Sequence, residues 1–319
     1  MTRLRHGGAL VAIGEGLGEL SLGAPGETSA TLGAGGDAGN IGVMAARLGA
    51  TVRLCGRVGD DGLGRWLLAS WSADGVDVGG VRFDAAAATG LYVNEPAQDG
   101  HRFTYWRAGS AGSRLEPGDL VPGLLDGLGM LVVTGVTLAV SRSSARAAAH
   151  AVAAARAAGG RVACVLNHRP ALGAEVAELA ALARAGDVLI GSREDAHAVF
   201  GTGEPAALRE LLAGGPDELV VTDGADAAVA FDGDRAWRQA VPAVEVRNAG
   251  GAGDALAGAY LAARLRGEPV ARSLAWGVAA ASSSVQREGC ASAYPTADET
   301  AAMLGELPPV APLVGSEHP

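Results

Sequence analysis

Short apolar runs alternate with alanine-rich segments along most of this chain, and this alternation limits the fold more than any other feature. The apolar runs are Ala9–Ile13, Val52–Val58, Met130–Thr134, Arg161–Leu166, Val188–Ile190 and Leu219–Thr222. The segments between them have helical character, as in Asn40–Leu48, where Ile41, Met44 and Leu48 share one face. The others are Gly64–Asp74, Ser144–Ala158, Glu175–Arg184, Ala206–Ala213 and Asp254–Leu265. Strands alternating with helices predict an α/β protein whose mostly parallel sheet is covered by helices. Ligands of such sheets bind at the carboxyl ends of the strands.

Two segments interrupt the alternation. Residues 17–33 are rich in glycine, and residues 89–108 contain two β-type runs around the turn Pro96–Gly100. We interpret both as strands of a small accessory sheet that acts as a lid. The core then comprises residues 1–16, 34–88 and 109–312. The proline-containing end at 313–319 is predicted to be a frayed tail.

The chain has no lysine, so all 25 residues in the combined lysine and arginine count are arginines. This excludes a Walker A loop, a protein-kinase active site and Schiff-base chemistry, each of which needs a lysine amine. If the protein handles phosphate, it must use arginine, metal ions or backbone amides.

The charge of the chain and its cysteines exclude further classes of partner and indicate its cellular compartment. The formal net charge is −10 and no basic run occurs, which argues against nucleic acid. No run approaches the ~18 apolar residues of a membrane span, and the first residues do not resemble a signal peptide. Three widely spaced cysteines are typical of buried thiols in a reducing compartment rather than of disulfides or a zinc site. We therefore expect a cytoplasmic protein.

A glycine run opens directly into the predicted helix that begins near Asp254. Free amides of Gly251, Ala252 and Gly253 at a helix start would favour an anion such as phosphate. A carboxylate in that position could accept a proton from an attacking hydroxyl. The alternative is that Asp254 is only a helix cap behind a flexible loop.

Three further places have residues suited to ligand binding. Gly36 and Asn40 precede a helix, where they could contact a ligand or simply form a turn and a cap. Arg107 ends the predicted lid strand and could clamp a carboxylate, although exposed edge arginines are common. Arg169 follows the run Arg161–Leu166 and could neutralise a phosphoryl group or lie at the surface. His168 has no partner at ligand spacing, so no metal site is assigned.

Together these motifs resemble the ribokinase-like sugar kinases, the phosphofructokinase-B family, along nearly the whole chain. The resemblance lies in Gly35–Asn40, Gly56–Asp61, Gly75–Asp77 and above all Gly251–Asp254. It implies a doubly wound α/β fold with a β-sheet lid, and ATP with Mg²⁺ as cofactors. Within the family, Tyr105–Leu115 and Thr134–Ala139 are similar to the corresponding stretches of 2-keto-3-deoxygluconate kinases.

This resemblance implies roles for individual residues. Asp254 would be the catalytic base, and Gly251, Ala252 and Gly253 would hold the phosphate charge. The sugar-acid pocket would contain Gly36, Asn40, Tyr92, Tyr105, Arg107 and Arg169. ATP would contact Asn167, Ser192, Thr222, Gly224, Ala227, Gly251 and Gly253. The implied activity is ATP-dependent phosphorylation of the terminal hydroxyl of a 2-keto-3-deoxy sugar acid.

The chain departs from the family pattern at four positions. Asn248 stands where an aspartate beside a monovalent cation is usual, which leaves K⁺ dependence open. Val165 replaces an acid, Ala227 a glycine and Trp276 an asparagine. The alternatives are therefore a family kinase of a neutral sugar or nucleoside, such as fructose or ribose, and a sugar-binding member with weakened catalysis. A dinucleotide-binding dehydrogenase is a further option, but Gly14–Glu19 lacks the required glycine spacing.

The physiological sugar, the preferred phosphoryl donor and the oligomeric state do not follow from these motifs. An open-faced lid sheet would expose apolar surface, so we expect a homodimer formed through the lid.

Overall fold

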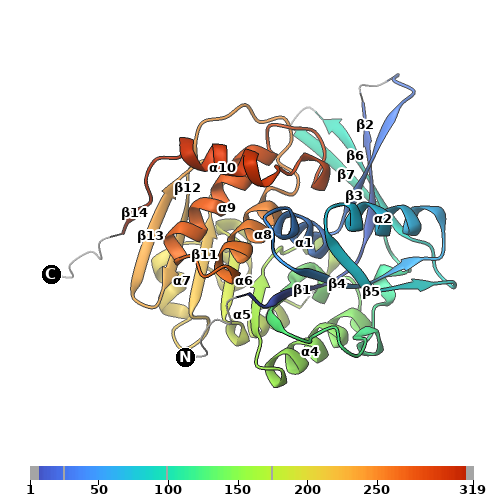
Figure 1. Cartoon of the computed structure of the whole chain (residues 1–319), viewed down its shortest axis with the longest axis horizontal. Helices are drawn as coiled ribbons and strands as arrows, with labels where there is room; N and C mark the ends of the chain where they lie inside the picture. Colours follow the sequence, from blue (N-terminus) through green and yellow to red (C-terminus); the bar gives the residue numbers. More distant parts are fainter. Residues whose placement is uncertain (1–6, 24–25, 98–99, 174, 314–319) are drawn as a thin grey trace.

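A large, mostly parallel sheet forms the centre of the computed structural model, which describes residues 7–23, 26–97, 100–173 and 175–313 (Figure 1). Its strands follow one another in the order β14 (Ala311–Pro312), β13 (Arg235–Ala240), β12 (Ala227–Asp232), β11 (Glu218–Thr222), β10 (Val188–Ser192), β9 (Arg161–Val165), β8 (Leu128–Thr134), β1 (Ala9–Ile13), β4 (Val52–Gly59) and β5 (Val76–Asp84). All pairs from β11 to β5 are parallel, and β12, β13 and β14 add antiparallel strands at one edge. The predicted α/β class is confirmed.

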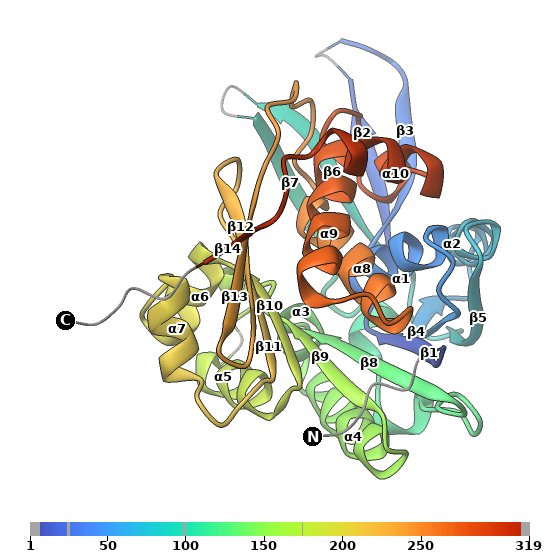
Figure 2. The same cartoon turned by 60° about the vertical axis from the view of Figure 1, so that its left-hand side comes forward.

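Helices cover both faces of this sheet, as Figure 2 shows. One face carries α1 (Asp37–Arg47), α8 (Ala252–Leu265) and α9 (Val270–Ser284), and the other carries α4 (Arg142–Ala157), α5 (Val176–Ala185), α6 (Arg193–Phe200) and α7 (Pro205–Leu211). Alternate residues of β1 explain the two layers: Leu10 and Ala12 belong to the first core, whereas Val11 and Ile13 pack with α4. A strand buried on both faces is therefore apolar at every position.

Helix α8 is buried along almost its whole length. Every residue from Asp254 to Leu265 is buried, and the helix packs between α1 and α9. Its many alanines and glycines permit this close packing, and a helix that is apolar on all sides belongs in a core. The first turn of α8 is consequently held in a fixed position.

A second, four-stranded sheet projects from the core in both views (Figures 1 and 2). Its order is β3 (Ala30–Gly35), β2 (Leu17–Leu22), β6 (Gly90–Ala97) and β7 (Gly100–Trp106). The register sets Glu19, Tyr92 and Tyr105 side by side on one face. These strands come from the two segments that interrupt the strand–helix alternation, so the expected small sheet is present. The boundaries proposed for the lid and core remain a prediction.

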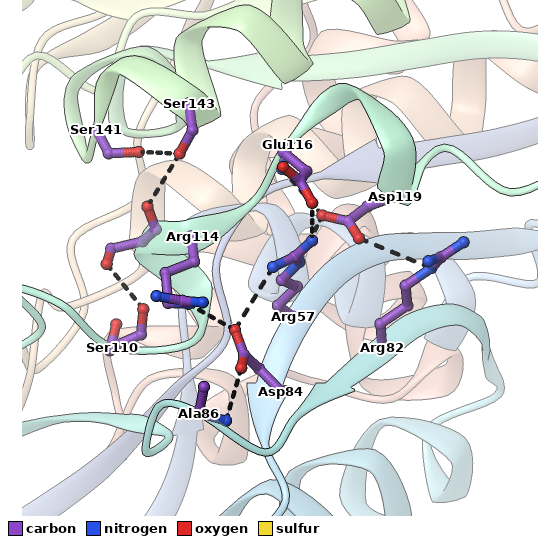
Figure 3. Close-up of polar contacts among 11 residues, drawn as sticks. Arg57, Arg82, Asp84, Ala86, Ser110, Arg114, Glu116, Asp119, Ser141 and Ser143 are labelled. Atoms are coloured by element: carbon purple, nitrogen blue, oxygen red, sulfur yellow. Dashed lines mark hydrogen bonds and ion pairs between the residues drawn. The ribbon is translucent and has the colours of Figure 1, made fainter.

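The segment that follows the small sheet is attached to the core by a network of ion pairs, which we call the root network (Figure 3). It consists of Arg57, Asp84, Arg114, Glu116 and Asp119. Arg57 on β4 binds Asp119 at 2.6 Å, Glu116 at 2.6 Å and Asp84 at 3.5 Å. Arg114 binds Asp84 at 2.7 Å. Because the Asp119 side chain is fully buried, this root network fixes the segment after β7 against β4 and β5.

The structure contains every strand and helix that the sequence predicted, together with several that it did not predict. The ends of the predicted elements are shifted by a few residues. Pattern analysis missed β5, β12, β13 and β14, and also α3 (Gly135–Ala139), α6, α9 and α10 (Ala297–Glu306). The predicted frayed tail begins at Leu313, but the N–H of Leu313 donates to Ala236 O at 2.8 Å, and residues 314–319 lie outside the described part.

Among the described helices, which also include α2 (Gly62–Ala73) and α3 (Gly135–Ala139), none is long and apolar enough to cross a membrane.

Candidate active site

A cavity of about 400 Å³ lies where the small sheet meets the carboxyl ends of β1, β8 and β9. Strand β1 pairs with β4 on one side and with β8 on the other, so the order of the strands changes direction at β1. Ligands of parallel α/β sheets bind at such switch points. The lining residues are Glu15, Leu17, Glu19, Gly36, Asp37, Asn40, Tyr92, Phe103, Tyr105, Arg107, Val136, Asn167, Arg169, Ala249, Gly250, Gly251, Gly253, Asp254 and Cys290.

Asp254 lies at the floor of this cavity. It is the third residue of α8, and the helix cap is Gly251, so the alternative that Asp254 is a plain cap is wrong. Its Oδ1 accepts a hydrogen bond from Asn167 Nδ2 at 2.9 Å, and its Oδ2 accepts one from Asn40 Nδ2 at 2.9 Å. The amide side chains of Asn40 and Asn167 therefore fix the orientation of the Asp254 carboxylate.

The electrostatic surroundings of Asp254 favour proton uptake. Burial, followed by the nearby charge of Asp37, raises the pKa of Asp254 to about 7, although hydrogen bonds from Asn40 and Asn167 and the charge of Arg169 act in the opposite direction. A general base works best when its pKa is close to the pH at which it operates. The geometry and the proton affinity of Asp254 both suit a base at neutral pH.

The start of α8 forms an open cradle of backbone amides beside this carboxylate. Gly251 has φ 77°, and a side chain there would meet Cys290 Sγ at 2.2 Å. A side chain at Gly253 would meet nothing within 4 Å, so space beside its amide is open to a ligand. First-turn N–H groups have no partner within the helix and attract anions. The Ala252 N–H, however, donates to Ala249 O at 3.3 Å, so the expectation that all three amides are free is wrong for Ala252. Asn248 Oδ1 accepts from the Gly250 N–H at 2.7 Å and holds the preceding loop.

All six residues expected in the sugar pocket line this one cavity: Gly36, Asn40, Tyr92, Tyr105, Arg107 and Arg169. Gly36 has φ 97°, and a side chain there would lie 2.3 Å from Glu15 O, so only glycine fits. The rings of Tyr92 and Tyr105 lie 5.4 Å apart between centroids. The structure brings these residues together, and their individual roles remain a proposal.

Arg107 reaches into the cavity from the end of β7. Its Nη2 forms an ion pair with Glu15 Oε1, whose side chain is fully buried. Its Nε is buried and has no hydrogen-bond partner among the described residues. Burial, and then Arg169, lowers the pKa of Arg107 to about 10, so the guanidinium stays charged at neutral pH. One donor of Arg107 is therefore left for a ligand.

Comparison with known proteins agrees with this geometry. The family model for pfkB family carbohydrate kinases matches residues 10–297. The chain belongs to this family. It is 34% identical to a 2-dehydro-3-deoxygluconokinase of Thermoproteus tenax, over 94% of this chain and 95% of the relative. It is 30% identical to a 5-dehydro-2-deoxygluconokinase of Shouchella clausii, over 85% and 86%. A fructokinase from Xylella fastidiosa with bound ATP has the same fold, with a TM-score of 0.83, 24% identity and coverage of 93% and 98%.

Besides Leu17, Val136, Ala249 and Gly250, the wall of this pfkB-family site contains five titratable or aromatic residues that sequence reasoning did not select. They are Glu15, Glu19, Asp37, Phe103 and Cys290. Glu15 lies two residues after the end of the central strand β1, a position that could have pointed to it. The others needed the structure, because a buried glutamate on a lid strand and a cysteine far along the chain have no local signal.

The residues expected to bind the nucleotide divide into two groups. Ser192, Thr222, Gly224 and Ala227 follow or flank the ends of β10 and β11, outside the lining of the cavity described above. Ser192 caps α6 by accepting from Asp195 N at 3.0 Å. Asn167, expected at the nucleotide, lies inside the cavity and binds the catalytic candidate Asp254. The nucleotide contacts of this carbohydrate kinase remain predictions.

Proposed function

We propose that the protein transfers the terminal phosphoryl group of ATP to the terminal hydroxyl of a dehydro-deoxy sugar acid such as 2-keto-3-deoxygluconate. The observation that supports this most strongly is Asp254, a buried carboxylate with a pKa near neutrality, beside an open amide cradle. The cationic side chains of Arg107 and Arg169 line the same cavity and suit an acidic substrate. Both relatives described above are named for dehydro-deoxygluconate.

The proposed chemistry uses few groups. Asp254 accepts the proton of the sugar hydroxyl while that oxygen bonds to the terminal phosphorus, and the bond between this phosphorus and the bridging oxygen breaks to release ADP. The amides of Gly251 and Gly253 stabilise the charge on the transferring group, and that of Ala252 joins them when it gives up its bond to Ala249 O. Asn40 and Asn167 keep the carboxylate in line.

The residues of the cavity suit ATP with Mg²⁺. The open space beside Gly253 would admit a phosphate, and the Xylella fructokinase of the same fold binds ATP. Among the described residues no three His, Cys, Asp or Glu side chains gather as a metal site. Mg²⁺ commonly binds through phosphate oxygens and water, so it would supply charge neutralisation without such a cluster. For K⁺, the Asn248 oxygen stands where the family usually has a carboxylate, and it already accepts from the Gly250 N–H at 2.7 Å.

One observation favours a second candidate, a kinase of a neutral sugar. Glu15 already pairs with Arg107, which reduces the positive charge that a substrate carboxylate would meet. Glu19, Asp37 and Asp254 add further acidic groups to the same cavity. A neutral ketose such as fructose would be less affected by these charges than a sugar acid.

A substrate panel with coupled ADP detection tests the two candidates. We expect turnover with 2-keto-3-deoxygluconate or 5-keto-2-deoxygluconate to exceed turnover with fructose and ribose, with little difference between K⁺ and choline buffers. A preference for fructose or ribose would overturn the sugar-acid proposal. Binding of a sugar without any ADP release would overturn the kinase activity itself and favour a sugar-binding protein with weakened catalysis.

We further propose that two copies associate through the outer face of the small sheet. Leu22, Leu32 and Trp106 are 40%, 40% and 58% exposed, and the strand alternation places them away from the cavity. Light scattering coupled to size exclusion should give a dimer for the native chain and a monomer for Trp106→Glu. A monomeric native protein would contradict this proposal.

A further inference from the structure

A second carboxylate lies beside the candidate base and has not been given a role. Asp37 is the first residue of α1 and is only 8% exposed. Its Oδ1 accepts from the Ala38 N–H at 2.8 Å, and its Oδ2 accepts from Asn167 Nδ2 at 3.2 Å. The same Asn167 nitrogen donates to Asp254 Oδ1 at 2.9 Å. One amide group thus spans two carboxylates.

The backbone of Asn167 holds the amide in this bridging position. Its φ of 33° lies in the left-handed region, which asparagine adopts more readily than most residues. The bridge brings together three separate parts of the fold: the start of α1, the segment after β9 and the first turn of α8. Since an amide NH₂ has two hydrogens, it can donate to both carboxylates at once.

We infer that Asp37 is a positioning residue for the reaction, which orients Asn167 against Asp254 and places a second negative charge next to the base. This inference rests on the proposed function only in taking Asp254 as the base. Asp37 itself needs no contact with the substrate. It acts through the bridging amide and through its charge.

The groups around the pair support an electrostatic effect. Arg169 is the nearby cation, and among the described residues no arginine forms an ion pair with either carboxylate. The other charged or titratable groups that face the pair or line the same cavity are Cys290, Tyr294, Tyr92, Tyr105, Glu15, Arg107 and Glu19. Burial raises the pKa of the Cys290 thiol and the Tyr294 hydroxyl, so both are neutral at physiological pH.

Two neighbouring carboxylates resist simultaneous ionisation. Burial raises the pKa of Asp37, and the charge of Asp37 contributes to the raised pKa of Asp254. A base with a higher pKa takes up the alcohol proton more readily, provided that it is deprotonated before the reaction. Removing the charge of Asp37 should therefore make Asp254 easier to ionise and a weaker proton acceptor.

The first test compares pH profiles of turnover in the native enzyme and in Asp37→Asn. The acidic limb should move to lower pH by roughly one unit, and the plateau of kcat should fall while KM for the sugar changes little. Asp37→Glu retains the charge and should keep the limb closer to its native position. Glu19→Gln is the matched control, because Glu19 is buried in the same cavity and contacts Cys290 N rather than Asn167. An unmoved limb in Asp37→Asn, or an equal shift in Glu19→Gln, would overturn the inference.

The second test needs no turnover, so it separates this inference from the proposed function. In protein labelled with ¹³C at aspartate carboxyl carbons, one signal should titrate near neutrality and be absent from Asp254→Asn. In Asp37→Asn that signal should titrate at lower pH. A shift here with no kinase activity on any sugar would sustain the carboxylate coupling and reject the substrate assignment. A signal with the same midpoint in both proteins would reject the coupling.

Discussion

Carboxylates with little exposure occur both in the root network and on the cavity floor, which is formed by Asp37 and Asp254. Their side-chain partners differ: arginines in the root network, and asparagine amides on the cavity floor. In the root network, arginines contact Asp84 and Asp119 (Figure 3). The Ala86 N–H and then Arg114 hold the pKa of Asp84 below its ordinary value. On the cavity floor, Asp37 and Asp254 receive amide donors, and the pKa of each is raised. On the cavity floor the amide donors do not offset burial, so the carboxylates stay able to exchange a proton, whereas the ion pairs of the root network help to fix a charge and stabilise the fold.

Glu218 shows that burial alone does not cause the difference. Its side chain is 3% exposed and binds Arg161, Arg264 and the Tyr260 hydroxyl. Burial acts to raise the pKa of Glu218, but the hydrogen bond from Arg264 and the charges of Arg161 and Arg264 lower it overall. The identity of the partner therefore separates a structural carboxylate from a candidate catalytic one.

The largest effect is expected when the cavity-floor carboxylate is neutralised. Asp254→Asn should lower turnover by roughly 10²- to 10⁴-fold, because it removes the proton acceptor while keeping the shape of the side chain. Circular dichroism and thermal unfolding should show an intact fold. Turnover within tenfold of the native value would show that Asp254 is not the base.

In the root network we expect a loss of stability rather than of activity. Arg57→Met should lower the free energy of unfolding by roughly 3–5 kcal/mol, because it leaves the buried Asp119 without its close partner. Arg65→Met removes an ion pair whose two side chains are more than half exposed, so the expected change is about 0–1 kcal/mol. Denaturant unfolding measures both. If Arg57→Met instead abolished turnover at full stability, the division between the two regions would fail.

A smaller effect concerns substrate choice. Arg107→Ala should lower kcat/KM for a sugar acid by roughly 10- to 100-fold, because a charge-assisted hydrogen bond is lost. Neutral ketoses should lose much less. Since this variant leaves Glu15 unpaired, the double variant with Glu15→Gln is the control for disruption of the cavity. Equal losses on both substrate types would contradict a carboxylate clamp.

The smallest predicted effect is a gain in the stability of Asp254→Asn, relative to the native protein, as the pH rises. Between the ordinary value of 3.8 and about 7, folded Asp254 keeps a proton that the unfolded chain releases, so the native protein loses stability as pH rises through this window. Asp254→Asn has no such titration. Its stability relative to the native protein should therefore increase from pH 5 to pH 8, on the order of 2 kcal/mol. Urea unfolding at both pH values would reveal a constant difference if the raised pKa were absent.

Much of this architecture was predictable because strand and helix periods are local. The runs around Ala9–Ile13 and Arg161–Leu166 and the glycine run before Asp254 carry their structure in their own residues. The small sheet was predictable as an interruption of the pattern. By contrast, β5 contains Gly79 and Gly80, and α9 ends in three serines, so neither has a strong local propensity.

The cavity floor was only partly predictable. Asp254, Asn40 and Arg107 follow from motifs, but the use of Asn167 as a bridge to Asp37 depends on a contact between residues 130 positions apart. The pairing of Glu15 with Arg107 depends on how the small sheet folds over β1. Such contacts come from tertiary packing, which no local pattern encodes.

The burial of α8 has a consequence for how enzymes of this design can diversify. The proposed proton acceptor Asp254 belongs to the stretch of this helix that is buried from Asp254 to Leu265, where almost any enlargement of a side chain would disturb neighbours. Phe103 and Tyr105 are 39% and 45% exposed on the small sheet, where replacements are better tolerated. New substrate preferences can therefore arise by drift in the outer strands, while the inherited phosphoryl-transfer apparatus stays unchanged beneath them.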